Sequence, residues 1–100
     1  MTMYDPPHPG EFIEEVYMKP FGLSGRFLAE KLAVSPSTFS RILKKQSSVT
    51  PEMALRLSIA LGRTPESWLA MQDNYDLWQI RQKTSFDNVR RVEFATKDHF

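Results

Sequence analysis

Few side chains of this 100-residue sequence could support catalysis, and they are widely separated. The chain has no cysteine, which excludes a thiol nucleophile, disulfides and thiolate zinc sites. Its two histidines, His8 and His99, lie near opposite ends, so the serines in between lack a histidine base within their own region. The four glycines are too scattered to form a phosphate-binding loop. We therefore expect no enzymatic activity, no cofactor and no metal site.

Residues 25–50 carry a different kind of chemistry, because basic and hydroxyl side chains recur there. The charged residues of this stretch are Arg26, Lys31, Arg41, Lys44 and Lys45, against Glu30 alone. Guanidinium, ammonium and hydroxyl groups are donors to phosphate oxygens and to base edges. Since the whole chain has a net charge of only +1, this local excess indicates an anion-binding face. A set of solvated surface charges is the alternative.

The elements that position these side chains are two short helices. Ser24 is a good N-cap for a helix that ends near Leu32. Ser35 followed by Pro36 is a strong start signal for the next helix, which we expect to run to about Lys45. Only Ala33 and Val34 separate the two helices.

Two helices joined so closely can cross at about 90–120° and place the second one in the DNA major groove. Ala29 is small at the point where the helices would cross, and apolar residues fix the crossing: Leu28, Leu32, Val34, Phe39 and Ile42. Polar residues are left on the outer side of the second helix: Ser37, Thr38, Ser40, Arg41 and Lys44. An ordinary helical hairpin would share the apolar stripe, but the whole combination favours DNA binding.

Three further helices are expected around this pair. Their ranges are 9–18, 51–61 and 65–82, and the second is apolar on most sides, which predicts a central, buried helix. The fold class is therefore all-α, a five-helix bundle containing a helix-turn-helix. We expect residues 1–83 to form a DNA-binding domain and residues 84–100 a tail that serves dimerisation or docking. Within the tail, residues 92–94 fit a short strand, a docked segment or disorder.

The sequence from Phe27 to Leu43 resembles the helix-turn-helix of phage-repressor-like (XRE/Cro) regulators. Other segments narrow the resemblance to antitoxins of the HigA/VapI type: His-Pro-Gly-Glu at 8–11, Thr-Pro-Glu-Met-Ala-Leu-Arg-Leu-Ser at 50–58, and the stretch 65–78. The similarity covers roughly residues 7–80. It implies a cytoplasmic homodimer that binds double-stranded operator DNA, represses its own operon and neutralises an RNase toxin of the HigB/RelE type.

Two positions depart from the family pattern. Ala33 stands where such turns usually carry glycine, which implies an adapted turn or modest strain. Pro36 stands near a position where related repressors often read a base with glutamine. Because proline cannot donate a hydrogen bond, we expect Ser37, Thr38 and Arg41 to read the sequence instead.

These patterns assign candidate roles. The DNA-binding candidates are Arg26, Ser35, Ser37, Thr38, Ser40, Arg41, Lys44 and Lys45. The candidates for toxin binding are the acidic residues Glu11, Glu14 and Glu15 of the first helix, and those for the dimer interface are Tyr75, Leu77 and Trp78. Trp68 is expected in the core, and His8 is expected to be structural or solvated. A solitary repressor without a toxin, and an interaction module that no longer binds DNA, are the alternative functions.

Size and composition agree with one cytoplasmic domain. Hydrophobic residues make up 41% and charged residues 25%, values typical of soluble domains. No apolar run approaches the roughly 18 residues of a membrane span. The first residues lack the basic and apolar regions of a secretory signal.

Overall fold

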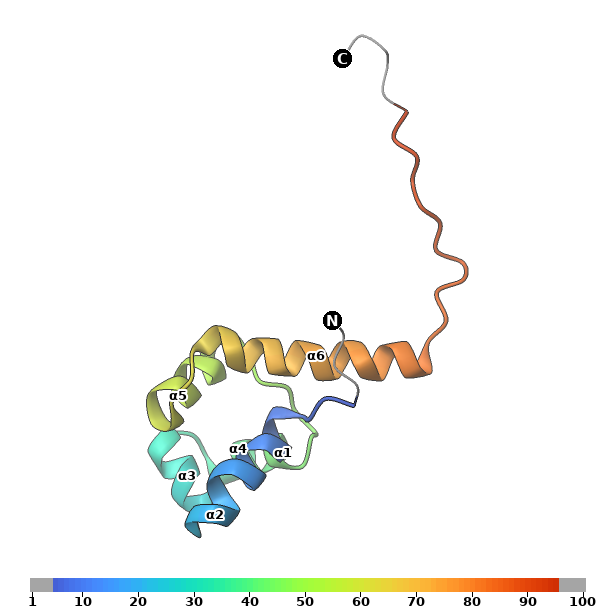
Figure 1. Cartoon of the computed structure of the whole chain (residues 1–100). Coiled ribbons are helices and arrows are strands. Elements are labelled where there is room, and N and C mark those ends of the chain that lie inside the picture. Colours follow the sequence, from blue (N-terminus) through green and yellow to red (C-terminus); the bar gives the residue numbers. More distant parts are fainter. Residues whose placement is uncertain (1–4, 96–100) are drawn as a thin grey trace.

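The computed structural model describes residues 5–95, which are helical up to Lys83 (Figure 1). The elements are α1 (Pro9–Ile13), the π-helical η1 (Glu14–Met18), α2 (Lys19–Phe21), α3 (Gly25–Leu32), α4 (Pro36–Leu43), α5 (Pro51–Leu61) and α6 (Pro65–Lys83). Because α1, η1 and α2 follow one another without a break, they count as one helix. The expected all-α fold of five helices is thereby confirmed.

The first helix is longer and less regular than expected. We placed its end near residue 18, because Pro20 has no N–H to donate. The helix instead continues to Phe21, and a wider π turn shifts its hydrogen-bond register immediately before the proline. It ends at Gly22, whose φ of 62° is left-handed, and the N–H of Leu23 donates to the Met18 carbonyl over 2.9 Å.

The later helices start where the capping signals predict. The side chains of Ser24, Ser35, Thr50 and Thr64 each accept a hydrogen bond from the backbone N–H three residues ahead. Each of these bonds satisfies one of the free donors at a helix start, which contributes about 1 kcal/mol per helix. The short helices of the bundle are therefore delimited by local chemistry.

The core lies where α1, α3, α4, α5 and the first half of α6 meet. Its largest fully buried side chains include Trp68, Phe39, Ile13 and Leu57. Trp68 is in the core as expected, and its indole N–H donates to the Gly62 carbonyl over 2.9 Å. The ring also packs against Phe12, so α6 is anchored to the first helix.

The expectation of a central, buried helix at 51–61 is wrong for one side of α5. Met53, Ala54 and Leu57 are buried, but Leu55 is exposed and Ile59 is 85% exposed. The helix packs against α3 and α6 on one side only, and Figure 1 shows it at one end of the molecule. The apolar residues on its other side therefore face solvent.

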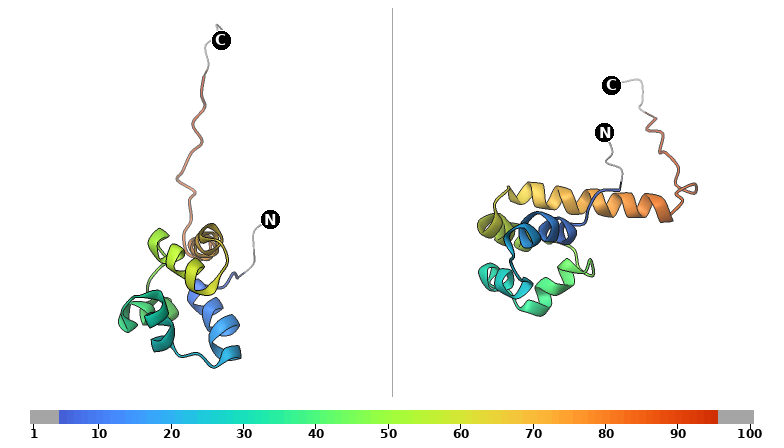
Figure 2. Two further views of the ribbon diagram at one scale, coloured as in Figure 1. Left: turned by 90° about the vertical axis from the view of Figure 1, so that its left-hand side faces the viewer. Right: turned by 60° about the horizontal axis from the view of Figure 1, so that its bottom comes forward.

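The second half of α6 extends beyond the bundle, and the tail leaves from its end at a steep angle (Figures 1 and 2). Residues 84–95 form no helix or strand, so the strand that was one of three alternatives for 92–94 is not present. A turn between Phe86 and Val89 closes with a backbone hydrogen bond of 2.9 Å. The described helices include none with the length and apolar character to span a membrane.

Candidate nucleic-acid interface

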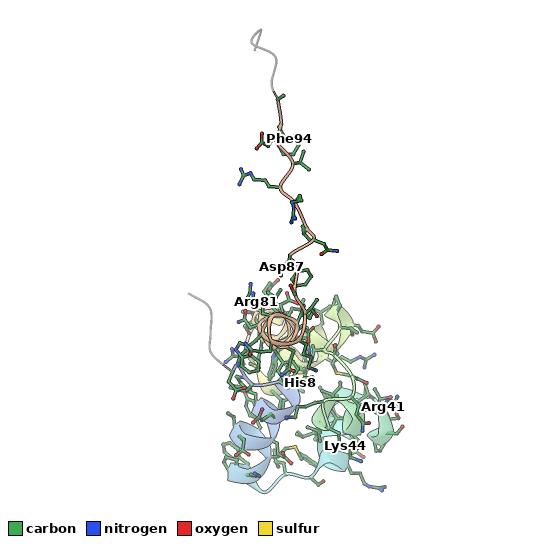
Figure 3. The ribbon with its side chains drawn as sticks, turned by 90° about the vertical axis from the view of Figure 1, so that its right-hand side faces the viewer. His8, Arg41, Lys44, Arg81, Asp87 and Phe94 are labelled. Carbon is green, nitrogen blue, oxygen red and sulfur yellow. The ribbon has the colours of Figure 1, made fainter. Side chains whose placement is uncertain are left out.

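Helix α4 presents one apolar and one polar side. Phe39 and Ile42 are buried in the core, whereas Ser37, Arg41 and Lys44 are exposed. Figure 3 shows Arg41 and Lys44 on the same side of the molecule, opposite the helix formed by α1, η1 and α2. The structure thus brings the predicted DNA-binding side chains of α4 together on an outward face.

The hydroxyl groups at the start of α4 are linked to one another. Ser35 Oγ accepts the backbone N–H of Thr38 over 3.1 Å and donates to Thr38 Oγ1 over 2.8 Å. It also lies 3.2 Å from Ser37 Oγ. Since Thr38 Oγ1 already accepts from Ser35, its own proton is available for an outside acceptor. Ser35 therefore caps the helix and orients Thr38.

The turn between α3 and α4 contains the backbone strain expected from Ala33. Its φ of 59° and ψ of 41° are left-handed, a conformation that costs a residue with a Cβ about 1–2 kcal/mol. The Val34 N–H donates to the Ala29 carbonyl over 3.0 Å and closes the turn. Val34 packs against the core, as expected.

Arg56 of α5 supports the same turn from behind. Its guanidinium donates to the carbonyls of Leu32 and Ala33 over 2.9 and 3.2 Å, which satisfies acceptors at the end of α3. Glu52 pairs with the same guanidinium at 2.9 Å. Sequence analysis missed this role, since an arginine on an amphipathic helix is usually a surface charge.

Gly10 sets the distance between α1 and α4. A Cβ at this position would lie 2.1 Å from the Ile42 carbonyl oxygen and 2.8 Å from the Leu43 Cα. The backbones of the two helices therefore approach as closely as only glycine allows. A glycine in the first turn of a helix was visible in the sequence, but its partner was not.

The loop from Lys44 to Thr50 is held by two buried polar side chains. Gln72 accepts the Val49 N–H over 2.9 Å and donates to Asp76 over 2.9 Å. His8 caps α1 by accepting the Gly10 N–H over 2.9 Å and hydrogen-bonds the Ser47 backbone. These bonds position the loop that follows the last basic residues of α4.

His8 is buried, so the structural alternative for this residue is confirmed and the solvated one is wrong. Its ring packs edge-on against Tyr75 with centroids 4.9 Å apart. Burial lowers the pKa of the imidazole below its usual value, and the nearby Asp76 carboxylate partly opposes that effect. A neutral His8 can then accept the Gly10 N–H with Nδ1. His99 lies outside the described residues.

The basic side chains of the interface have no carboxylate partner. Across residues 5–95 the two salt bridges are Lys19–Glu15 and Arg56–Glu52, so Arg26, Arg41 and Lys44 keep their charge available. Arg26 lines a pocket of about 530 Å³ between α3 and the start of α4, together with Phe27, Glu30 and Pro36.

The remaining predicted residues lie elsewhere. Glu11, Glu14 and Glu15 are exposed on the first helix, and Glu15 is paired with Lys19 over 2.8 Å. On α6, Tyr75 and Trp78 are half-buried and Leu77 is 47% exposed. The acidic and apolar candidates therefore occupy surfaces separate from the outward face of α4.

This arrangement defines a helix-turn-helix unit, and comparison with known proteins agrees. Residues 16–69 match the model of the family described as helix-turn-helix. Virulence-associated protein I of Dichelobacter nodosus is 44% identical over 82% of this chain and 76% of its own length. Antitoxin HigA-1 of Vibrio cholerae is 35% identical over 82% of this chain and 77% of its own length.

Solved structures give the same result. The antitoxin GraA in complex with its operator superposes with a TM-score of 0.81 at 38% identity, covering 94% of this chain and 97% of GraA. The chain belongs to the helix-turn-helix family of phage-repressor-like regulators, in the group that includes the HigA antitoxins. The resemblance identified from the sequence is thereby confirmed. This family is one of DNA-binding regulators and antitoxins.

Proposed function

We propose that this protein is a dimeric, sequence-specific DNA-binding repressor that also serves as the antitoxin of a toxin–antitoxin pair. The observation that carries the DNA-binding part is the outward face of α4, where Arg41 and Lys44 have no acidic partner among residues 5–95. The relationship to GraA, solved in complex with its operator, supports the same reading.

Each candidate side chain has a role that its surroundings favour. Arg41 lies on the exposed face in the last turn of α4 and reads a base edge, together with Ser37, Thr38 and Ser40 of the same helix. Lys44, Lys45 and Arg26 lie at the ends of helices and contact phosphates. Ser35 acts through Thr38, because its own hydroxyl is already engaged.

Two substitutions separate base reading from phosphate contact. Arg41→Ala should lower affinity for the operator by about 1–3 kcal/mol and relax preference at one or two base pairs. Lys44→Ala should weaken binding to operator and random DNA alike and reduce the salt slope by about 1 per contacted site. Mobility shifts at several salt concentrations, on the upstream DNA and on a scrambled duplex, measure both effects.

Lys19→Ala is the matched control, because it removes one positive charge from α2, away from the outward face of α4. It should leave operator affinity unchanged. If Arg41→Ala binds operator and scrambled DNA in the wild-type ratio, Arg41 does not read sequence. If the wild type itself shows no salt-sensitive shift, the chain is an interaction module and not a repressor.

The dimer is inferred from the small DNA-binding surface of a single copy. One short recognition helix covers too few base pairs for operator specificity, so two copies would read half-sites about 34 Å apart. The domain formed by residues 1–83 would supply the recognition helix. The protruding end of α6 would supply the contact between copies, through Leu77, Trp78 and the tail at 84–100.

The antitoxin part rests on the relatives that are named antitoxins and on the acidic first helix. An RNase toxin of the HigB/RelE type must hold RNA phosphates, so its active face should be basic. Glu11, Glu14 and Glu15 are exposed on α1 and η1, and a toxin bound there would leave the outward face of α4 open. Charge complementarity of this kind acts mainly on the association rate and on specificity. The pairing of Glu15 with Lys19 makes Glu11 and Glu14 the stronger contributors.

The test requires a small RNase gene beside this gene; its product is mixed with the protein in a stopped-flow measurement. Changing Glu11, Glu14 and Glu15 together to Gln should slow association at low salt, with a difference that shrinks at high salt. The control changes three other exposed acids, Glu30, Glu66 and Glu93, to Gln. Equal slowing in both variants would show that only net charge matters, and unchanged association in the first would exclude the acidic helix. If no toxin gene is present, the protein is a solitary repressor.

A further inference from the structure

The tail carries large apolar side chains that contact little of their own molecule. The exposed residues are Phe86, Val89, Val92 and Phe94, of which Phe94 is 83% exposed. The segment nevertheless has local structure, because a backbone hydrogen bond from Val89 to Phe86 closes a turn. Within this turn the Ser85 hydroxyl accepts the Asp87 N–H, and the Arg90 guanidinium donates to the Asp87 carbonyl. A segment with a formed turn and exposed apolar side chains is suited to bind an apolar surface.

The same molecule has an unfilled apolar groove at the other end of α6. It has a volume of about 290 Å³ and is lined mainly by Pro6, Pro7, Phe12, Ala70 and Met71. Arg63 forms part of the wall, where its guanidinium stacks over the Phe12 ring at 5.1 Å. The groove is large enough for one or two side chains of the size of valine or phenylalanine.

Charges around the groove complement those of the tail. Arg63 is the charged residue among those that line the groove. In the tail, Glu93 directly precedes Phe94. A tail that inserts Phe94 would bring the Glu93 carboxylate near the Arg63 guanidinium.

The geometry favours a second copy as the source of the tail. In Figures 1 and 2 the tail runs away from the bundle of its own chain. If two α6 helices pack antiparallel about a two-fold axis near Trp78, Lys83 of one copy lies opposite Asp73 of the other, next to the groove. The partner's groove is then about 10–15 Å away, at 1.5 Å per residue along α6 and 8–10 Å between helix axes. Residues 84–94 span up to about 35 Å when extended, which is sufficient.

We propose that the tail of one copy binds in the groove between the N-terminal segment and α6 of a second copy, with Phe94 as the inserted side chain. The exchange is reciprocal, as two-fold symmetry requires. It specifies the contact surface of the dimer in the proposed function and rests on that dimer. The superposition on GraA with its operator covers 94% of this chain, so it continues past Lys83 into the tail.

The absence of cysteine allows a direct test by disulfide trapping. One variant carries Ala95→Cys, beside Phe94, and another carries Ala70→Cys in the groove, so the apolar anchors stay in place. After the two purified proteins exchange subunits and are oxidised mildly, we expect a covalent heterodimer on a non-reducing gel. Because each chain has one cysteine, a heterodimer between them can form only between copies.

Ala60→Cys is the matched control, since this exposed position lies on α5, at the opposite end of the molecule from the tail. Mixed with Ala95→Cys, it should give at least tenfold less heterodimer. An equal yield from both mixtures would overturn the proposal. A cross-link that forms only within a chain carrying both Ala70→Cys and Ala95→Cys would show that the tail folds back on its own groove, and would overturn it as well.

A second measurement keeps this proposal separate from the proposed function. Phe94→Ser should raise the dissociation constant of the dimer at least tenfold in sedimentation experiments, while the circular dichroism of the helices stays unchanged. If Phe94→Ser leaves the dimer intact and operator binding is normal, the tail exchange is wrong but the repressor function stands. If the wild type is monomeric at operator-saturating concentration, the dimer itself is wrong.

Discussion

The helix-turn-helix and the C-terminal third of the molecule use their apolar residues in opposite ways. In the first region Phe39, Ile42 and Leu28 are buried, and their helices are held by contacts to backbone atoms. In the second region Leu77 and Ile80 are each 47% exposed, and the tail buries none of its described side chains. The helix-turn-helix buries its apolar side chains within the chain, whereas the C-terminal third leaves them exposed.

The difference in burial fits two different roles, DNA recognition for the helix-turn-helix and association for the C-terminal third. A recognition helix must be held to within a fraction of an ångström to place Arg41 against a base, so it is fixed by close backbone approaches and buried polar bonds. A surface that joins two copies can remain open in one chain, because association buries its apolar side chains. Substitutions in the first region should therefore change the stability of the monomer, and substitutions in the second should change association.

The largest expected effect is at Gly10. Gly10→Ala forces α1 away from α4, because the added Cβ would meet backbone atoms that cannot turn aside. We expect a loss of about 3 kcal/mol in the free energy of unfolding, at the upper end of overpacking effects, and a marked loss of operator binding. Chemical denaturation followed by circular dichroism measures the first, and a mobility shift the second.

Gly25→Ala is the control for that change. A Cβ there would meet the ends of two side chains, Leu43 at 3.3 Å and Met18 at 3.9 Å, and both side chains can move. The unfolding free energy should change by less than about 1 kcal/mol. Equal destabilisation by both substitutions would mean that the close approach at Gly10 does not position α4.

Removal of residues 84–100 tests the role of the C-terminal region in association. The dimer should dissociate more readily, with a dissociation constant raised at least tenfold, which corresponds to about 1.4 kcal/mol. The unfolding free energy of the monomer should stay within about 0.5 kcal/mol of the full chain, as expected for surface changes. Sedimentation and denaturation at low protein concentration separate the two quantities. A dimer of unchanged strength would confine the interface to α6 or move it elsewhere, for example to the exposed Leu55 and Ile59 of α5.

Much of the first region could be predicted from the sequence, because its signals are local. Caps such as Ser35 and Thr50, the short turn at Ala33, and the apolar stripe of α4 each act within a few residues. The contacts that sequence analysis missed join distant residues: Gly10 with Ile42, Arg56 with Leu32, and Gln72 with Val49. The sequence contains no local sign of such pairings.

The error at α5 has a related cause. An apolar circumference predicts burial only if neighbouring helices surround the element, and the number of neighbours depends on how the chain packs. Only one side of α5 is covered, by α3 and α6. Leu55 and Ile59 of α5 therefore expose apolar side chains, as the end of α6 and the tail also do.

The smallest expected effect is at Ala33, in the turn of the helix-turn-helix. Ala33→Gly should relieve the left-handed conformation of the turn, which costs alanine about 1–2 kcal/mol. The greater freedom of glycine in the unfolded chain offsets about 0.4–1 kcal/mol of that gain. We therefore expect a net stabilisation of about 0.5–1 kcal/mol, with operator affinity unchanged. Ala29→Gly, at a buried position within α3, should instead destabilise the protein by about 1 kcal/mol or more. If Ala33→Gly is also destabilising, the bonds from Arg56 to the turn carbonyls hold Ala33 without strain, and the departure from the family's glycine has no energetic cost.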